Sequence, residues 1–266
     1  MLIAGIDIGS GSTKCILVDE SGAVKGRGLV KTKANFEKVA GEVLDMARSD
    51  AGPAAGQVGY VATTGLGRYA VPFRDIQITD LTCGARGAAT LFPSTKYVLD
   101  IGAQCSRAIK LRENGKVKEF HMNEKCAAGS GGFLERAAKY LEVRIADVGP
   151  MSLQAAKPQP ISSVCAVLAE TEIINHISDG ASVENILRGI HDSLADRSLL
   201  LLKRVGLDGE VTLIGGVALQ EGMLASLRDK LGVTVNVPKE PHLTAALGAA
   251  LLGLQRYRKL APAAAA

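Results

Sequence analysis

The chain has 266 residues, of which 47% are hydrophobic, 4% are aromatic and 30 are glycine, and it has no tryptophan. This length and composition suit a compact α/β protein of one large or two medium domains with many tight turns. The net charge of +4 is small. Since single-stranded nucleic acids bind to aromatic faces and basic grooves, we expect no nucleic-acid partner.

The five cysteines are odd in number and include no Cys-x-x-Cys pair. The chain starts with a strand-like run instead of a signal-peptide pattern, and no stretch approaches the length of a membrane-spanning helix. We therefore expect a cytoplasmic protein, outside the membrane, whose thiols are reduced. The pattern favours a packing role for Cys15 and Cys83 and leaves Cys105 open. The four histidines form no metal-ligand pair, which favours surface or packing positions.

The first third of the chain predicts a strand–turn–strand opening, unlike the Rossmann unit, in which a glycine loop leads into a helix. Ser21 and Gly22 mark a hairpin turn. Apolar residues at helical spacing then predict an amphipathic helix. The expected strands span residues 2–7, 14–19, 24–30 and 59–63, and the expected helices span 36–48 and 81–92, the second closed by Pro93.

The opening pattern then recurs. A strand that ends in Asp-Ile-Gly occurs at Asp7 and again at Asp100, 93 positions later (100 − 7). Strands are expected at residues 97–101, 107–111 and 117–122, with a hairpin turn at Asn114-Gly115. We interpret this as an internal duplication of three strands and a helix, with domains at residues 1–93 and 94–260 and the last helix free to pack back on the first domain.

The remainder of the chain is predicted to be mostly helical. Helices are expected at residues 131–141, 145–156, 165–178, 182–205, 220–231 and 243–257, with residues 199–202 as the buried part of the longest. Strands are expected at 210–214 and 234–237, and a disordered tail at 261–266.

The two Asp-Ile-Gly turns, facing each other across a cleft, suit a nucleotide with its metal ion. Asp7 and Asp100 can hold Mg²⁺ directly or through water, and both are candidate catalytic residues together with Gln104. Small residues allow the backbone and hydroxyl groups to approach phosphates, and Lys14 can add a positive charge. The candidate nucleotide-binding residues are Gly9, Ser10, Gly11, Ser12, Thr13, Lys14, Gly102, Gly129, Ser130, Gly131, Gly215 and Gly216.

These motifs resemble the two phosphate motifs and the adenosine motif of the actin/hexokinase/Hsp70 ATPases. The segments 123–131 and 162–172, which contain Cys126 and Cys165, resemble the BadF/BadG/BcrA/BcrD-type iron–sulfur branch of that superfamily. The resemblance runs from Leu2 to about Leu254. It implies an actin-like ATPase with duplicated ribonuclease-H-like domains and a nucleotide cleft between them.

The resemblance also implies that Cys126 and Cys165, 39 positions apart (165 − 126), are cluster ligands. In that family, each subunit of a dimer gives two cysteines to one bridging [4Fe–4S] cluster. Both cysteines stand just before predicted helices, and the positive end of a helix stabilises an anionic cluster. The implied cofactors are ATP, Mg²⁺ and the cluster. Ordinary packing is the alternative for both cysteines.

Two branches of the family fit the chain. Residues 62–68, 107–109, 165–172 and 185–191 look closest to the D-type ATPase subunit of benzoyl-CoA reductase. The chain reads Ala-Gln-Cys105 where activators of 2-hydroxyacyl-CoA dehydratases read Gly-Gln-Asp. The first branch implies an ATP-hydrolysing subunit that drives low-potential electrons to ring reduction, and the second implies a homodimeric activator. A reductase of double-cubane cluster proteins stays open as a third relative.

The implied partners are an identical or paralogous ATPase subunit, catalytic iron–sulfur reductase or dehydratase subunits, and a ferredoxin-type electron donor. Two other classes share the phosphate motifs: a sugar-kinase-like phosphotransferase and a metal-free interaction ATPase. Glu170 and Glu172, just after Cys165, are expected to tune the cluster, contact nucleotide or lie on a solvated helix face.

Overall fold

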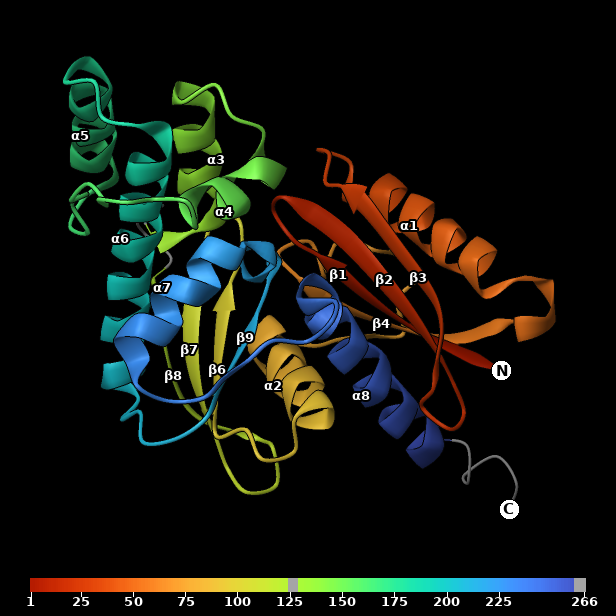
Figure 1. Cartoon of the computed structure of the whole chain (residues 1–266). Coiled ribbons are helices and arrows are strands. Elements are labelled where there is room, and N and C mark those ends of the chain that lie inside the picture. Colours follow the sequence, from red (N-terminus) through yellow and green to blue (C-terminus); the bar gives the residue numbers. More distant parts are fainter. Residues whose placement is uncertain (124–128, 261–266) are drawn as a thin grey trace. The chain divides into compact units, whose positions relative to one another are not determined.

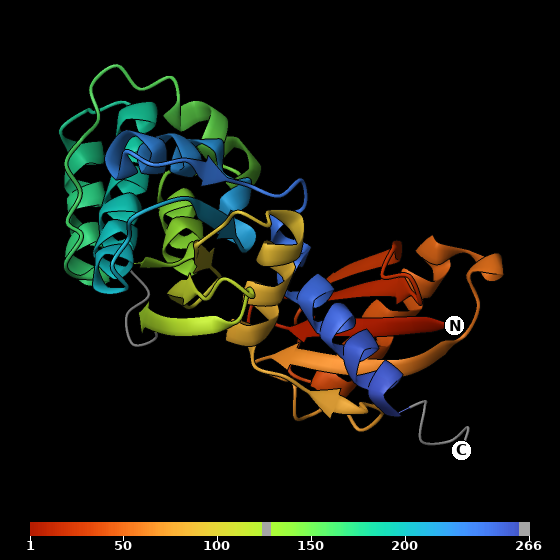
Figure 2. The ribbon, with the colours of Figure 1, turned by 90° about the horizontal axis from the view of Figure 1, so that it is seen from below.

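The computed structural model of the protein describes residues 1–123 and 129–260. In these residues the strands form two five-stranded sheets, ordered β3-β2-β1-β4-β5 and β10-β9-β6-β7-β8. Contacts divide the chain into two units (Figures 1 and 2). Unit 1 contains Met1–Pro93, Glu113–Val117 and the described residues from Leu243 on, and unit 2 contains Ser94–Arg112 and Lys118–His242.

Unit 1 consists of the first sheet and three helices. Its elements are β1 (Leu2–Ile8), β2 (Ser12–Asp19), β3 (Val24–Lys31), α1 (Phe36–Ala51), β4 (Val58–Gly65), β5 (Ile76–Gln77), α2 (Asp80–Leu91) and α8 (Thr244–Leu260). Strand β1 pairs antiparallel with β2 and parallel with β4.

Strand β1 is buried on both faces, because successive side chains point to opposite sides of a sheet. Leu2, Ala4, Ile6 and Ile8 share a core with α1, whereas Ile3 shares one with α8. A central strand covered by helices on both faces has a nearly continuous run of apolar residues. Such a run, ending at Asp7, is why a buried strand was predicted at residues 2–7.

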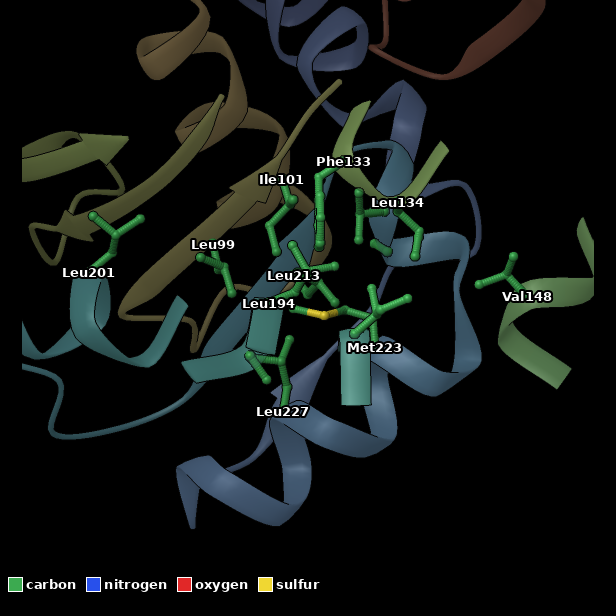
Figure 3. Packing of buried hydrophobic residues seen from close by; sticks show 14 of the residues in the cluster. Leu99, Ile101, Phe133, Leu134, Val148, Leu194, Leu201, Leu213, Met223 and Leu227 are labelled. Carbon is green, nitrogen blue, oxygen red and sulfur yellow. The ribbon is translucent and has the colours of Figure 1, made fainter. Parts of the chain in front are cut away.

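Unit 2 contains β6 (Tyr97–Ile101), β7 (Ser106–Leu111), most of β8 (Val117–Asn123), α3 (Gly131–Tyr140), α4 (Ile145–Ser152), α5 (Ala166–Ser178), α6 (Val183–Arg204), β9 (Val211–Ile214), α7 (Glu221–Leu231) and β10 (Val235–Asn236). Its main core joins the sheet to the helices. Leu99 and Leu213 from the sheet meet Leu194 of α6 and Leu227 of α7, and Phe133 and Leu134 bring in α3 (Figure 3).

The duplication predicted from the two Asp-Ile-Gly segments is confirmed by the strand orders. Read from one edge, both sheets place their second strand beside the first and their first beside the fourth. In each sheet the first strand pairs antiparallel with the second, as β1 does with β2 and β6 with β7. Its other neighbour, β4 or β9, is parallel to it. The predicted cleft between the halves stays a prediction, as do the limits of the two domains.

Some element predictions were wrong. Strand β5 was missed because two residues are too few to show a periodic pattern. Helix α4 ends at Ser152 instead of residue 156, and the Ser152 hydroxyl donates to the carbonyl of Gly149. Residues 199–202 are not uniformly buried, because consecutive helical residues point in different directions: Leu200 is 57% exposed, whereas Leu202 is fully buried.

In the part of the chain that the structure describes, no helix has the length and apolar character needed to span a membrane. The predicted disordered tail at residues 261–266 lies outside the described residues.

Candidate functional site

The turn between β1 and β2 holds an ion pair at the end of the sheet's central strand. Asp7 and Lys14 stand opposite each other in the strand register, and the Lys14 Nζ lies 3.1 Å from the Asp7 carboxylate. Both side chains are only 12–13% exposed. The Gly9 N–H donates to the carbonyl of Ser12 at 3.2 Å and closes the turn.

The hydroxyl groups of this turn have different surroundings. The Thr32 hydroxyl donates to the carbonyl of Gly9 at 2.7 Å. The Thr13 hydroxyl, which is fully buried, therefore donates to the oxygen of Thr32 at 2.9 Å. Through Thr32 it is linked to the backbone of the turn at Gly9. Ser10 and Ser12 are half-buried, and Gly11 is exposed. Residues 10–12 thus present accessible donors, whereas Thr13 holds the turn in shape.

The turn between β6 and β7 repeats this arrangement in unit 2. Asp100 stands opposite Arg107, whose guanidinium lies 2.9 Å from the carboxylate, and both side chains are 15% exposed. The Gly102 N–H donates to the carbonyl of Cys105 at 2.9 Å. Gln104 is exposed at the tip. Each unit therefore has an acidic residue on its first strand and a basic residue seven positions later. Between them lies a turn closed by a hydrogen bond from a glycine N–H to the carbonyl three residues further on.

A glycine with positive φ completes each arrangement. Gly65 is the last residue of β4, with φ +84°, and a Cβ there would lie 2.5 Å from Oδ1 of Asp7. Gly215 follows β9 at φ +92°, and a Cβ there would lie 2.8 Å from Oδ1 of Asp100. Both positions require glycine for conformation and for space. Gly216, in contrast, is exposed and has open space around its Cα.

The segment 129–132 packs on the second turn. The Gly131 N–H donates to the carbonyl of Gly102 at 2.9 Å, and the Gly132 N–H donates to that of Ala103 at 2.8 Å. Gly129 and Ser130 are buried. Of the three candidate nucleotide ligands in this segment, Gly131 is the most accessible, and all three lie at the start of α3.

Cys165 stands at the N-cap of α5, as the pattern predicted. Its thiol is free of any disulfide and half-buried. Its neighbours Val164, Val167 and Leu168 are 54–78% exposed. Cys126 lies outside the described residues, and the described ones include no cluster of three metal-ligating side chains. A thiol at a helix N-terminus, with exposed apolar residues near it along the chain, fits a ligand of an anionic cluster.

The other described cysteines divide into two kinds. Cys15 and Cys83 are fully buried, which confirms the packing interpretation. Burial raises the pKa of each of these two thiols to about 12, so neither is a thiolate at neutral pH. Cys105 is half-buried in the second turn.

Glu170 and Glu172 do not lie free on a solvated face. Glu170 pairs with Arg136 of α3 at 2.7 Å, and Glu172 accepts the N–H of Ser162. His191 is fully buried and its Nδ1 lies 3.0 Å from the Ser152 hydroxyl, so it has a packing role, one of the two that the sequence allowed.

Two residues of the paired turns, Arg107 and Gly65, were not predicted as site residues. Arg107 was noted only for its family likeness, although its seven-residue distance from Asp100 equals that of Lys14 from Asp7. Gly65 was noted only within residues 62–68, for their family likeness, although it corresponds to Gly215. In both cases the signal was the internal repeat, extended beyond the Asp-Ile-Gly segments.

The doubled sheet, with its paired acid-and-base turns, has the fold of the actin-like ATPases. A ROK family glucokinase from Streptomyces griseus shares this fold over 96% of the chain and all of its own, with a TM-score of 0.61 and 14% identity. At that identity the likeness shows the fold alone.

Residues 4–253 match the BadF/BadG/BcrA/BcrD ATPase family, and the chain belongs to it. It is 43% identical to a component of the benzoyl-CoA reductase of Thauera aromatica, over 98% of the chain and 95% of that component. It also resembles the structure of the activator of 2-hydroxyisocaproyl-CoA dehydratase from Clostridium difficile with bound ADPNP. That likeness has a TM-score of 0.93 and 35% identity, over 98% of this chain and 97% of the activator. The family predicted from the motifs is thereby confirmed.

Proposed function

We propose that this protein is an ATP-hydrolysing electron-transfer subunit that shares a [4Fe–4S] cluster with a partner ATPase subunit. The observation that carries the proposal is the combination of two equivalent acid-and-base turns with a free, half-buried thiol at a helix start. The first feature fits a nucleotide with its metal ion, and the second fits a cluster ligand.

The two turns support the nucleotide part of the proposal. Exposed or half-buried residues 10–12 offer N–H and hydroxyl donors for phosphate oxygens. Lys14 and Arg107 add positive charge, and Asp7 and Asp100 supply the oxygen ligands that Mg²⁺ prefers. Gln104, exposed in the turn that follows Asp100, would orient a water molecule for attack on the terminal phosphate. The similarity of this chain to the activator structure with bound ADPNP also supports nucleotide binding by this chain.

The start of α5 supports the cluster part of the proposal. Cys165 and Cys126 would hold the cluster, and two ligands from a second protomer would complete its four thiolates. When bound, the cluster supplies a site for one low-potential electron. The helix N-terminus at Cys165 would stabilise the negative charge, and the exposed Val164 and Val167 would be covered by the partner.

The test uses two cysteine variants of anaerobically purified protein. Cys165→Ser should lower the iron content from about four per two ATPase subunits to near zero, because a hydroxyl does not replace the thiolate. Nucleotide affinity should stay within about twofold of the wild-type value, since the variant leaves both turns intact. Cys105→Ser is the matched control and should keep its iron. Loss of ATP binding with full iron in Cys165→Ser would contradict the assignment.

For the physiological role, we propose that this chain drives electrons to a benzoyl-CoA reductase, with a ferredoxin-type donor. The 43% identity to a component of that enzyme supports this role. The second candidate is a homodimeric activator of a 2-hydroxyacyl-CoA dehydratase, which the likeness to the activator structure supports.

Affinity purification of the protein from its native cells, under anaerobic conditions, separates these two roles. A paralogous ATPase subunit with two larger iron–sulfur subunits would support the reductase. A homodimer without them would support the activator. A colourless, iron-free protein that phosphorylates a sugar would contradict both roles and favour the phosphotransferase alternative.

A further inference from the structure

The second phosphate turn is bonded directly to the start of α3. Two main-chain hydrogen bonds join Gly131 and Gly132 to the carbonyls of Gly102 and Ala103, at 2.9 and 2.8 Å. The buried Ser106 hydroxyl donates to the carbonyl of Gly129. A Cβ at Gly132 would lie 2.8 Å from the Ala103 oxygen, so the two segments are in close contact. A change in the shape of this turn must therefore move the first turn of α3.

Helix α3 is anchored in the core of unit 2 along its length. Phe133 and Leu134 are at most 1% exposed, and Phe133 lies near Ile101 at the end of β6 (Figure 3). Ala137, one turn further along α3, is also fully buried. Because a close-packed interior transmits displacement instead of absorbing it, a shift at the helix start reaches its far end.

An ion pair joins α3 to α5. The Nε of Arg136 lies 2.7 Å from Oε1 of Glu170, and the Tyr140 hydroxyl donates to Oε2 of the same carboxylate at 3.3 Å. The Glu170 side chain is 21% exposed and that of Arg136 is 41% exposed, so the pair is partly shielded from water. Glu170 is five residues after Cys165, which is the N-cap of α5.

We propose that α3 relays the state of the second phosphate turn to α5, and that Arg136 and Glu170 are the positioning residues through which it acts on the Cys165 end. The proposal rests on the proposed function, because it requires nucleotide at the turn and a cluster thiolate at Cys165. It assigns Glu170 a mechanical role: neither a ligand of the metal nor a contact of the nucleotide, it keeps α5 in register with α3.

The experiment compares amide hydrogen exchange of the full, anaerobically prepared complex with Mg²⁺ and either ADP or a non-hydrolysable ATP analogue. Exchange reports local opening of each segment separately. In the wild type, both the turn at residues 102–106 and helix α5 should change their exchange between the two nucleotides. In Glu170→Gln the response of the turn should persist, and the response of α5 should fall about fivefold, which is the size of a moderate coupling.

Two further variants sharpen the test. Arg136→Gln should reproduce Glu170→Gln, and the exchanged pair Arg136→Glu/Glu170→Arg should restore much of the α5 response. The matched control is Arg144→Gln, which breaks an exposed 2.7 Å ion pair with Asp147 in the same unit and should leave both responses intact.

The possible outcomes separate a failure of the relay from a failure of the proposed nucleotide site. A wild-type turn that responds while α5 does not would overturn the relay and leave nucleotide binding standing. A full α5 response in Glu170→Gln, equal to that of the Arg144→Gln control, would also overturn it. A turn that does not respond in the wild type would contradict the proposed nucleotide site, and the relay with it.

Discussion

At the scale of single residues, the site depends on two glycines that bring backbone against a carboxylate. Gly65 and Gly215 have positive φ, and any side chain there would press on Asp7 or Asp100. L-residues with a Cβ adopt this conformation at a cost. The absence of a side chain at Gly65 and Gly215 thus leaves the space that the carboxylates of Asp7 and Asp100 occupy.

Gly215→Ala should destabilise the protein by about 1–3 kcal/mol, from the strained φ and the clash with the backbone of Ile101. It should also weaken nucleotide binding at least about tenfold, since Asp100 must move, which corresponds to about 1.4 kcal/mol or more. Urea unfolding and nucleotide titration measure the two effects. Gly41→Ala in α1, where a Cβ would meet nothing within 4 Å and φ lies outside the left-handed region, is the control. Equal behaviour of the two variants would contradict the site geometry.

His191 should make the stability of unit 2 depend on pH. Its full burial lowers the pKa of the imidazole to about 4, from an ordinary value near 6.5. The folded protein therefore keeps the His191 ring neutral. The contribution of this neutral ring to the stability of the folded state is complete above pH 6.5 and is lost as the pH falls toward 4. Between pH 7 and pH 5 this loss amounts to about 2 kcal/mol.

Urea unfolding of the wild type and of His191→Gln at the two pH values measures that contribution. The variant cannot titrate at this position, and its amide can still bond to Ser152. Its unfolding free energy should therefore fall less than that of the wild type between pH 7 and pH 5. The same decrease in both proteins would show that His191 is not the group responsible.

At the scale of elements, the sequence predicted those strands and helices whose own residues carry a recognisable pattern, such as an apolar run, a glycine turn or an N-cap. The apolar run of β1 and the glycine turn after it mark a strand end in any context, so two copies of Asp-Ile-Gly predicted the duplication. The N-cap position of Cys165 also followed from the residues around it. Helix α6 was predicted almost to the residue, because Ser182 caps its start and its apolar residues recur at helical spacing.

Contacts between elements were not predictable in the same way. The pairing of Asp100 with Arg107 depends on the register of β6 and β7. That register is a property of the folded hairpin and has no signal in the residues of either strand alone. The pairing of Arg136 with Glu170 depends on how α3 and α5 pack, across 34 residues of sequence. The sequence left Glu170 with three possible roles because a side chain five residues after a cysteine carries no signal of its partner.

At the scale of the whole molecule, a duplicated ATPase fold carries a thiol site in one of its two units. The helices α3 and α5, with Cys165 at the start of α5, belong to unit 2 together with the second phosphate turn. The relay through Arg136 and Glu170 therefore needs no contact outside that unit.

The proposed function requires ATP hydrolysis on this chain before an electron can leave its cluster. The direct test is to reduce the anaerobic complex, mix it with Mg²⁺ and either ATP or ADP, and follow the cluster absorbance and the partner's reduction together. We predict that the electron reaches the partner with ATP and that the cluster stays reduced with ADP. Equal transfer with both nucleotides, or a protein without iron, would contradict the claim.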